Sequence, residues 1–176
     1  IVGGTPGTGD IGLGVAAGLC GGVGLVLFYW AMAQGPMSVV APVSAVMSAI
    51  VPTVAGVVDG ERPAALAVVG ILLALPAIVL ISREPTNDDD EADRHRASAR
   101  AIAAATVSGI GFGLFFTFIS HTSDDSGLWP LAGARSAAIL LALVVVAGTR
   151  PARPTVDGAK LAMLTGCLDA TGNSLF

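Results

Sequence analysis

The chain has 176 residues, of which 53% are hydrophobic and 12% are charged, and its formal net charge is -4. An ordinary soluble domain carries about 25% charged residues, so a soluble fold of this length would lack the polar surface to cover itself. The sequence also has no basic patch with interleaved aromatic residues, which argues against nucleic-acid binding. The composition therefore predicts a membrane protein.

Apolar stretches separated by polar joints predict six transmembrane helices, most of them near the ~20 residues that cross about 30 Å of hydrocarbon. They cover residues 12–34, 37–58, 64–82, 99–121, 129–148 and 160–176. Most joints are short, so neighbouring helices should run antiparallel. The exception is the acidic segment 83–98, which is too charged to pack and predicts a solvated linker.

These elements predict an all-α, polytopic helical bundle in two parts, residues 1–82 and 99–176, joined by the linker 83–98. The chain opens on Ile1 and closes on Phe176 inside an apolar run. We therefore expect a longer parent protein that is truncated here at both ends.

Small residues spaced by four predict two faces at which helices approach closely. The first helix carries Gly14, Gly18 and Gly22, and the fourth carries Ala101, Ala105, Gly109 and Gly113. In lipid there is little hydrophobic force between helices, so close backbone packing must hold them together.

The second predicted helix contains Pro42 and Pro52, each of which removes one helical hydrogen bond and predicts a kink. Ser44 and Ser48 lie one turn apart on one face of the same helix. A kinked, polar helix at mid-membrane fits the wall of a substrate cavity. A kinked packing helix with back-bonded serines is the alternative, and the sequence leaves both open.

Two features should lie at the membrane surface. Tyr29, near the end of the first helix, is either a cavity residue or part of an interfacial aromatic belt. Gly60, Glu61 and Arg62 form a tight structural turn for which a capping or hinge role is expected.

In the sixth predicted helix, Asp169 and Asn173 continue a polar stripe that begins at Thr165. Asp169 follows Lys160 by nine residues, which places it about 14 Å deep, near the bilayer centre. A carboxyl group at that depth is costly unless it is paired, protonated or hydrated. Arg135 is its candidate partner, because it lies at a similar depth in the fifth helix. Three interpretations are open: a structural salt bridge, a substrate or proton site, or two unrelated groups.

An internal repeat relates the first and last helices. At a constant offset, Gly18, Gly24 and Phe28 align with Gly166, Gly172 and Phe176. The sixth helix comes five helices after the first, an odd number, so the second copy would cross the membrane in the opposite direction, as inverted-topology repeats do. Chance similarity between glycine-rich helices is the alternative.

The first three predicted helices and their joints contain the short strings LFYWAMA at 27–33, VAPV at 40–43, VPTV at 51–54, DGER at 59–62 and VGI at 69–71. Together these strings resemble the EamA-type half of the drug/metabolite transporter superfamily. Arg135 and the stretch 166–176 are similar to the second copy of that repeat. The resemblance implies ten helices in two inverted five-helix repeats around a central cavity, of which this chain would hold the third to the eighth.

The resemblance implies a secondary transporter that moves a small metabolite or drug-like solute by alternating access, with proton coupling as a further hypothesis. Candidate cavity residues are Tyr29, Ser44, Ser48, Asp169 and Asn173. We expect no enzymatic activity, no cofactor and no metal. A membrane enzyme acting on lipid headgroups, or a non-transporting assembly subunit, is the alternative.

The expected partners are the solute and the lipid bilayer, and a homodimer is a further possibility. The expected location is the bacterial plasma (inner) membrane. The orientation usual in the family conflicts with the positive-inside rule. That orientation would place the joints 83–98 and 149–160 outside, yet both carry several basic residues.

Overall fold

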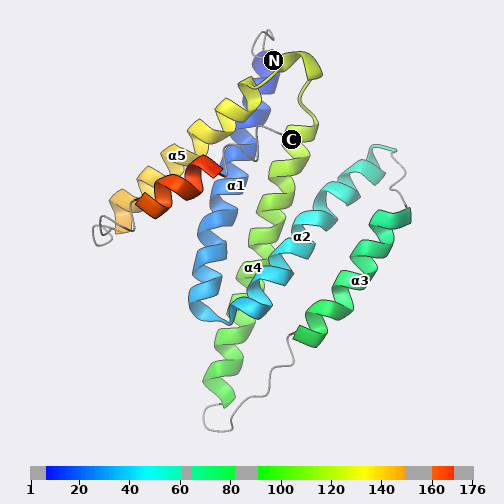
Figure 1. Cartoon of the computed structure of the whole chain (residues 1–176), viewed down its shortest axis with the longest axis vertical. Coiled ribbons are helices and arrows are strands. Elements are labelled where there is room, and N and C mark those ends of the chain that lie inside the picture. The colour runs from blue at the N-terminus through cyan, green and yellow to red at the C-terminus, as the bar shows by residue number, and fades with distance from the viewer. Residues whose placement is uncertain (1–6, 61–64, 82–90, 150–159, 169–176) are drawn as a thin grey trace. The chain divides into compact units, whose positions relative to one another are not determined.

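The computed structural model describes residues 7–60, 65–81, 91–149 and 160–168, and this part of the chain is helical apart from short connections (Figure 1). The elements are α1 (Thr8–Gln34), α2 (Met37–Val58), α3 (Ala65–Ile81), α4 (Glu91–Ser120), the 3₁₀ turn η1 (Asp124–Ser126) and α5 (Trp129–Thr149), followed by a helical segment at 160–168. The structure confirms the all-α class and shows helix in each of the six predicted spans, and residues 169–176 of the last span lie outside the described residues.

Four helices are long and apolar enough to cross a membrane among the residues that the structure describes. They are Thr8–Gln34, Met37–Val58, Ala99–Ser120 and Trp129–Thr149. The helix α3 has 17 residues and spans about 26 Å at 1.5 Å per residue. Together these helices make the protein a multi-pass integral membrane protein.

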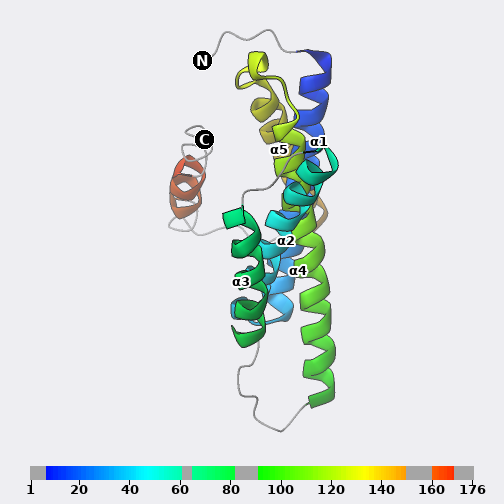
Figure 2. The same ribbon diagram turned by 90° about the vertical axis from the view of Figure 1, so that its right-hand side faces the viewer.

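Helix α4 begins well before its apolar part, because residues 91–98 of the predicted linker are helical and extend it (Figure 2). The extension contains alanine, arginine and glutamate, which favour helices. Acidic residues also stabilise the first turn of a helix, where the helix dipole is positive.

The chain forms two compact units, residues 1–143 and 144–176. The second unit holds the end of α5 and the segment 160–168. Every side chain of the segment 160–168 is exposed. All the helix packing described below lies in the first unit.

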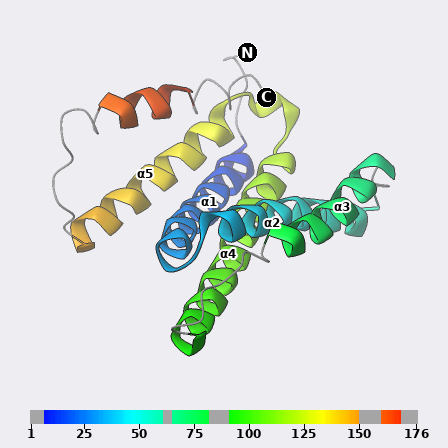
Figure 3. The ribbon, with the colours of Figure 1, turned by 60° about the horizontal axis from the view of Figure 1, so that its bottom comes forward.

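Helix α4 is the centre of the first unit, because it packs along both α1 and α2, whereas α1 and α2 touch each other much less (Figure 3). The buried apolar cluster lies where these three helices meet. It consists of Ala31, Val40, Ala101, Ala104 and Ala105, with Phe28, Met32 and Val43 packed against it. Small residues dominate the cluster, so the backbones themselves lie close together.

Helices α2 and α4 meet through the predicted small-residue face of α4. A Cβ added at Gly109 would lie 2.5 Å from both the Ser44 carbonyl oxygen and the Met47 Cβ, and one added at Gly113 would lie 2.5 Å from the Val51 Cβ. Such distances are too short for any real Cβ, so only glycine allows this approach. The packing role predicted for the α4 face is confirmed.

The small-residue face of α1 packs against the start of α5. A Cβ at Gly14 would overlap the backbone of Pro130, and one at Gly18 would overlap the backbone of Ala134. Pro130 and Ala134 are buried, while α5 exposes Ile139, Leu140 and Leu143 further along. The packing role predicted for Gly14 and Gly18 is therefore confirmed as well.

Substituting Gly109 with alanine should destabilise the bundle by about 1–3 kcal/mol, because the new methyl group meets backbone atoms that cannot move aside cheaply. The matched control is Gly12→Ala in α1, where an added Cβ meets nothing within 4 Å. Alanine is the better helix former, so this control should be neutral or slightly stabilising. Unfolding free energies in detergent micelles measure both, and equal stabilities would contradict the packing described above.

Candidate functional site

The predicted cavity residues Ser44 and Ser48 both lie on α2, but their hydroxyl groups are used differently. Ser44 is 2% exposed, and its Oγ donates to the carbonyl oxygen of Ala105 on α4 at 2.9 Å. Ser48 is half-buried, and its Oγ donates back to the carbonyl of Ala45 at 2.7 Å. Ser44 therefore joins two helices, whereas Ser48 bonds within its own. A cavity-lining role for either serine stays a prediction.

A second buried serine joins α4 to α1. Ser108 is fully buried, and its Oγ donates to the carbonyl oxygen of Gly24 at 2.7 Å. Ser108 lies one turn beyond Ala105, which accepts the hydrogen bond from Ser44. One turn of α4 is thus hydrogen-bonded to both of its neighbours. The sequence analysis did not single out Ser108, although a serine among small residues in a membrane helix is the available signal.

Pro42 and Pro52 both lie inside α2, which continues through them from Met37 to Val58. Each proline lacks an N–H, so it leaves one backbone carbonyl of the preceding turn without its helical donor. In a membrane protein, neighbouring helices can satisfy such carbonyls, and α4 packs along α2. The kinks predicted at Pro42 and Pro52 stay predictions.

Tyr29 lies on the exposed side of α1, with 61% of its surface accessible. Its ring packs edge-on against the half-buried Phe28, with 5.9 Å between the ring centroids. Phe28 in turn contacts Phe112 of α4. Both earlier interpretations of Tyr29, a cavity residue or an interfacial aromatic, are compatible with this position.

The predicted turn after α2 is present at Gly60, whose φ angle is +89°. Its N–H donates to the carbonyl of Val57 at 3.1 Å, which ends the helix. Glycine suits this position because residues with a Cβ are strained at positive φ. Glu61 and Arg62 lie outside the described residues.

The predicted pairing of Arg135 with Asp169 stays a prediction. Arg135 is half-buried on α5, one residue after Ala134, whose backbone meets Gly18. Asp169 and Asn173 lie outside the described residues.

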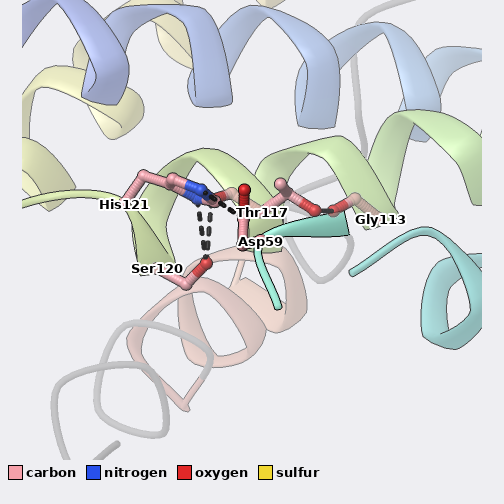
Figure 4. A network of polar contacts seen from close by, with 5 residues as sticks. All are labelled: Asp59, Gly113, Thr117, Ser120 and His121. Atoms are coloured by element: carbon pink, nitrogen blue, oxygen red, sulfur yellow. Dashed lines mark hydrogen bonds and ion pairs between the residues drawn. The ribbon is translucent and has the colours of Figure 1, made fainter. Parts of the chain in front are cut away.

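A polar network lies at the end of the bundle where α2 and α4 both end (Figure 4). His121 directly follows α4, and its Nε2 lies 3.0 Å from Oδ2 of Asp59, which caps the end of α2. The Nδ1 of His121 lies 2.7 Å from the carbonyl oxygen of Thr117. Ser120 donates to the same carbonyl at 2.9 Å.

A second contact at this end ties the α4–α5 connection to the start of α1. The Oγ of Ser123 donates to Oδ2 of Asp10 at 2.6 Å, and the N–H of Ser123 donates to Oδ1 of Asp10 at 3.2 Å. Both carboxylate oxygens of Asp10 are therefore used by one residue.

The sequence patterns include Asp59 only in the DGER string and assign no role to His121. The residues are 62 positions apart, so no local motif links them. They meet because α2 and α4 run parallel in constant register, with Ser44 bonded to Ala105 at a separation of 61. The available signal was limited to the position of each residue just after a predicted helix.

Comparison with known families finds one match, in the first part of the chain. Residues 3–83 match the EamA-like transporter family, which confirms the resemblance seen in the sequence strings and is consistent with the drug/metabolite transporter superfamily. The match covers α1, α2 and α3. No curated protein and no solved structure matches the chain significantly.

Ser44→Ala should lower the free energy of unfolding by about 0.6 kcal/mol, and at most about 1.7, because it removes a hydrogen bond between two membrane helices. Ser48→Ala is the matched control on the same helix, since it removes only a bond to the preceding turn. It should be close to neutral. Steric-trap unfolding in bicelles measures both variants, and an equal or larger loss for Ser48→Ala would contradict the assignment.

Proposed function

We propose that this chain, with its EamA-like transporter domain at residues 3–83, is part of a secondary transporter that moves a small metabolite or drug-like solute across the bacterial plasma membrane by alternating access. The family match carries the proposal, because it covers the three consecutive helices α1, α2 and α3. The four candidate spans support the membrane setting.

In this proposal the two predicted parts, residues 1–82 and 99–176, rock against each other. Helices α1 and α2 belong to the first part, and α4 and α5 belong to the second. The parts meet along faces of small residues, where Gly24 lies against Ser108 and Gly109 against Ser44. Where only glycine and serine meet, a change of angle needs little side-chain repacking, whereas Phe28 and Phe112 also meet across this boundary and would have to repack.

The solute would bind near mid-membrane, beside the proline-containing helix α2 and the predicted polar stripe that contains Asp169 and Asn173. Proton coupling through Asp169 is the finer hypothesis. A carboxyl group in that setting is costly when charged, so taking up a proton would stabilise it during one half of the cycle. Arg135, if it lies near, would favour the charged form in the other half.

Transport into vesicles by the full-length protein tests this function. Wild-type protein should move solute with a dependence on the pH gradient, and Asp169→Asn should remove that dependence, because an amide cannot bind and release a proton. The control is Asp89→Asn in the acidic linker, which should leave transport unchanged.

Two outcomes would count against the proposal. Uptake that is unchanged in Asp169→Asn would exclude coupling through this residue but leave the transporter assignment in place. The absence of uptake for any solute in a broad metabolite panel would favour the alternative of a non-transporting membrane protein.

A further inference from the structure

Two polar contacts hold together the end of the bundle where α2 and α4 terminate. The proposed transport cycle assigns no role to either contact. The first is the contact of His121 with Asp59, which is an ion pair when His121 is protonated, and the second is the pair of hydrogen bonds from Ser123 to Asp10. His121 and Ser123 lie two residues apart, in the connection between α4 and α5. One short segment therefore bonds to the end of α2 and to the start of α1.

Both contacts cross the boundary between the two predicted parts of the chain. Asp59 and Asp10 belong to residues 1–82, whereas His121 and Ser123 belong to residues 99–176. The bonds of Ser44 and Ser108 cross the same boundary in the buried middle of the bundle. At the end, by contrast, the side chains of His121 and Asp59 are 49% and 51% exposed, so water can replace their contact.

The hydrogen-bond geometry of His121 fits the protonated imidazole. Nδ1 faces the carbonyl oxygen of Thr117, and Nε2 faces the carboxylate of Asp59. Both partners are acceptors, and the Oγ of Ser120, 3.5 Å from Nδ1, is a longer contact whose hydroxyl already donates to the Thr117 carbonyl. A neutral imidazole carries only one N–H. Protonated His121 can donate to both at once, whereas neutral His121 must give up one contact.

The charged groups around His121 are acidic in the part of the chain that the structure describes. Asp59 faces it from α2, Asp10 lies against the neighbouring Ser123 from α1, and Asp125 is exposed in η1. Glu61 and Arg62 follow Asp59 closely in sequence and lie outside the described residues. The described acids favour a positive charge on His121.

We propose that the segment from His121 to Ser123 is a pH-sensitive clasp that holds this end of the transport path closed while His121 is protonated. The inference rests on the proposed transporter function, since it names the end that opens. Imidazole changes its charge between pH 5 and 8. The clasp is therefore closed at acidic pH, and it loosens as the pH rises and His121 loses its proton.

Distances between two spin labels, measured by double electron–electron resonance on the full-length protein in liposomes, test the clasp. Spin labels replace the exposed residues Val54 on α2 and Phe116 on α4, after Cys20 and Cys167 are changed to alanine. When the pH is lowered from 8 to 5.5, the ratio of the short-distance population to the long-distance population should rise by up to about five-fold. This is the largest change that an exposed ion pair is expected to produce.

His121→Gln should remove this pH response, because glutamine does not titrate. Asp59→Asn should also flatten it, since an amide side chain can donate to neutral Nε2 and so replaces the charge-dependent contact. The matched control is His95→Gln, which removes the other histidine of the chain, near the opposite end of α4, and should keep the full response.

A pH response that persists in both His121→Gln and Asp59→Asn, or a wild-type protein without any response, would overturn the clasp. The same vesicles report on the proposed function separately. Transport with pH-independent distances would reject the clasp and keep the transporter. A pH-dependent distance change with no transport of any solute would keep the clasp as a conformational switch and reject the transporter.

Discussion

The close approach of backbones along α4 is the constraint on which the rest of the bundle depends. Gly109 lets α2 approach until the Ser44 carbonyl lies 2.5 Å from where a Cβ would stand, and Gly111 similarly leaves room for the carbonyl of Cys20 on α1 at 2.8 Å. At this range a serine hydroxyl on one helix reaches a carbonyl on the next, as Ser44 and Ser108 do. In lipid, where apolar burial contributes little between helices, such contacts supply the cohesion.

The register set in the buried middle also determines what meets at the exposed end. Helix α2 runs parallel to α4, with a separation of 61 residues at the Ser44–Ala105 bond and 62 at the His121–Asp59 pair. The offset is thus conserved over about four turns. A shift of one residue in the glycine contacts would rotate Asp59 by about 100° around α2 and separate it from His121. The polar network at the surface is therefore a consequence of small residues in the interior.

Hydropathy predicted the helices well because a bilayer imposes both length and polarity on each span, and α2 has the bounds that the sequence predicted. Spacing of small residues predicted which faces pack, including Gly18 and Gly109, but not which helix each face meets. The pairing of Asp59 with His121 was out of reach, since each residue alone is typical of a solvated helix end. Ser44 and Ser48 looked equivalent in sequence, and only the position of α4 distinguishes them.

The contrast between the middle and the end of the bundle has a mechanical consequence for any rocking motion. Opening the seam at Ser108 would expose a buried hydroxyl and the carbonyl of Gly24 to hydrocarbon, where neither finds a replacement partner. Breaking the half-exposed His121–Asp59 pair costs only about 0–1 kcal/mol, because water solvates both groups. A rotation that keeps the buried contacts as its pivot and breaks the polar contacts at the exposed end therefore costs less than a movement that opens the buried seam.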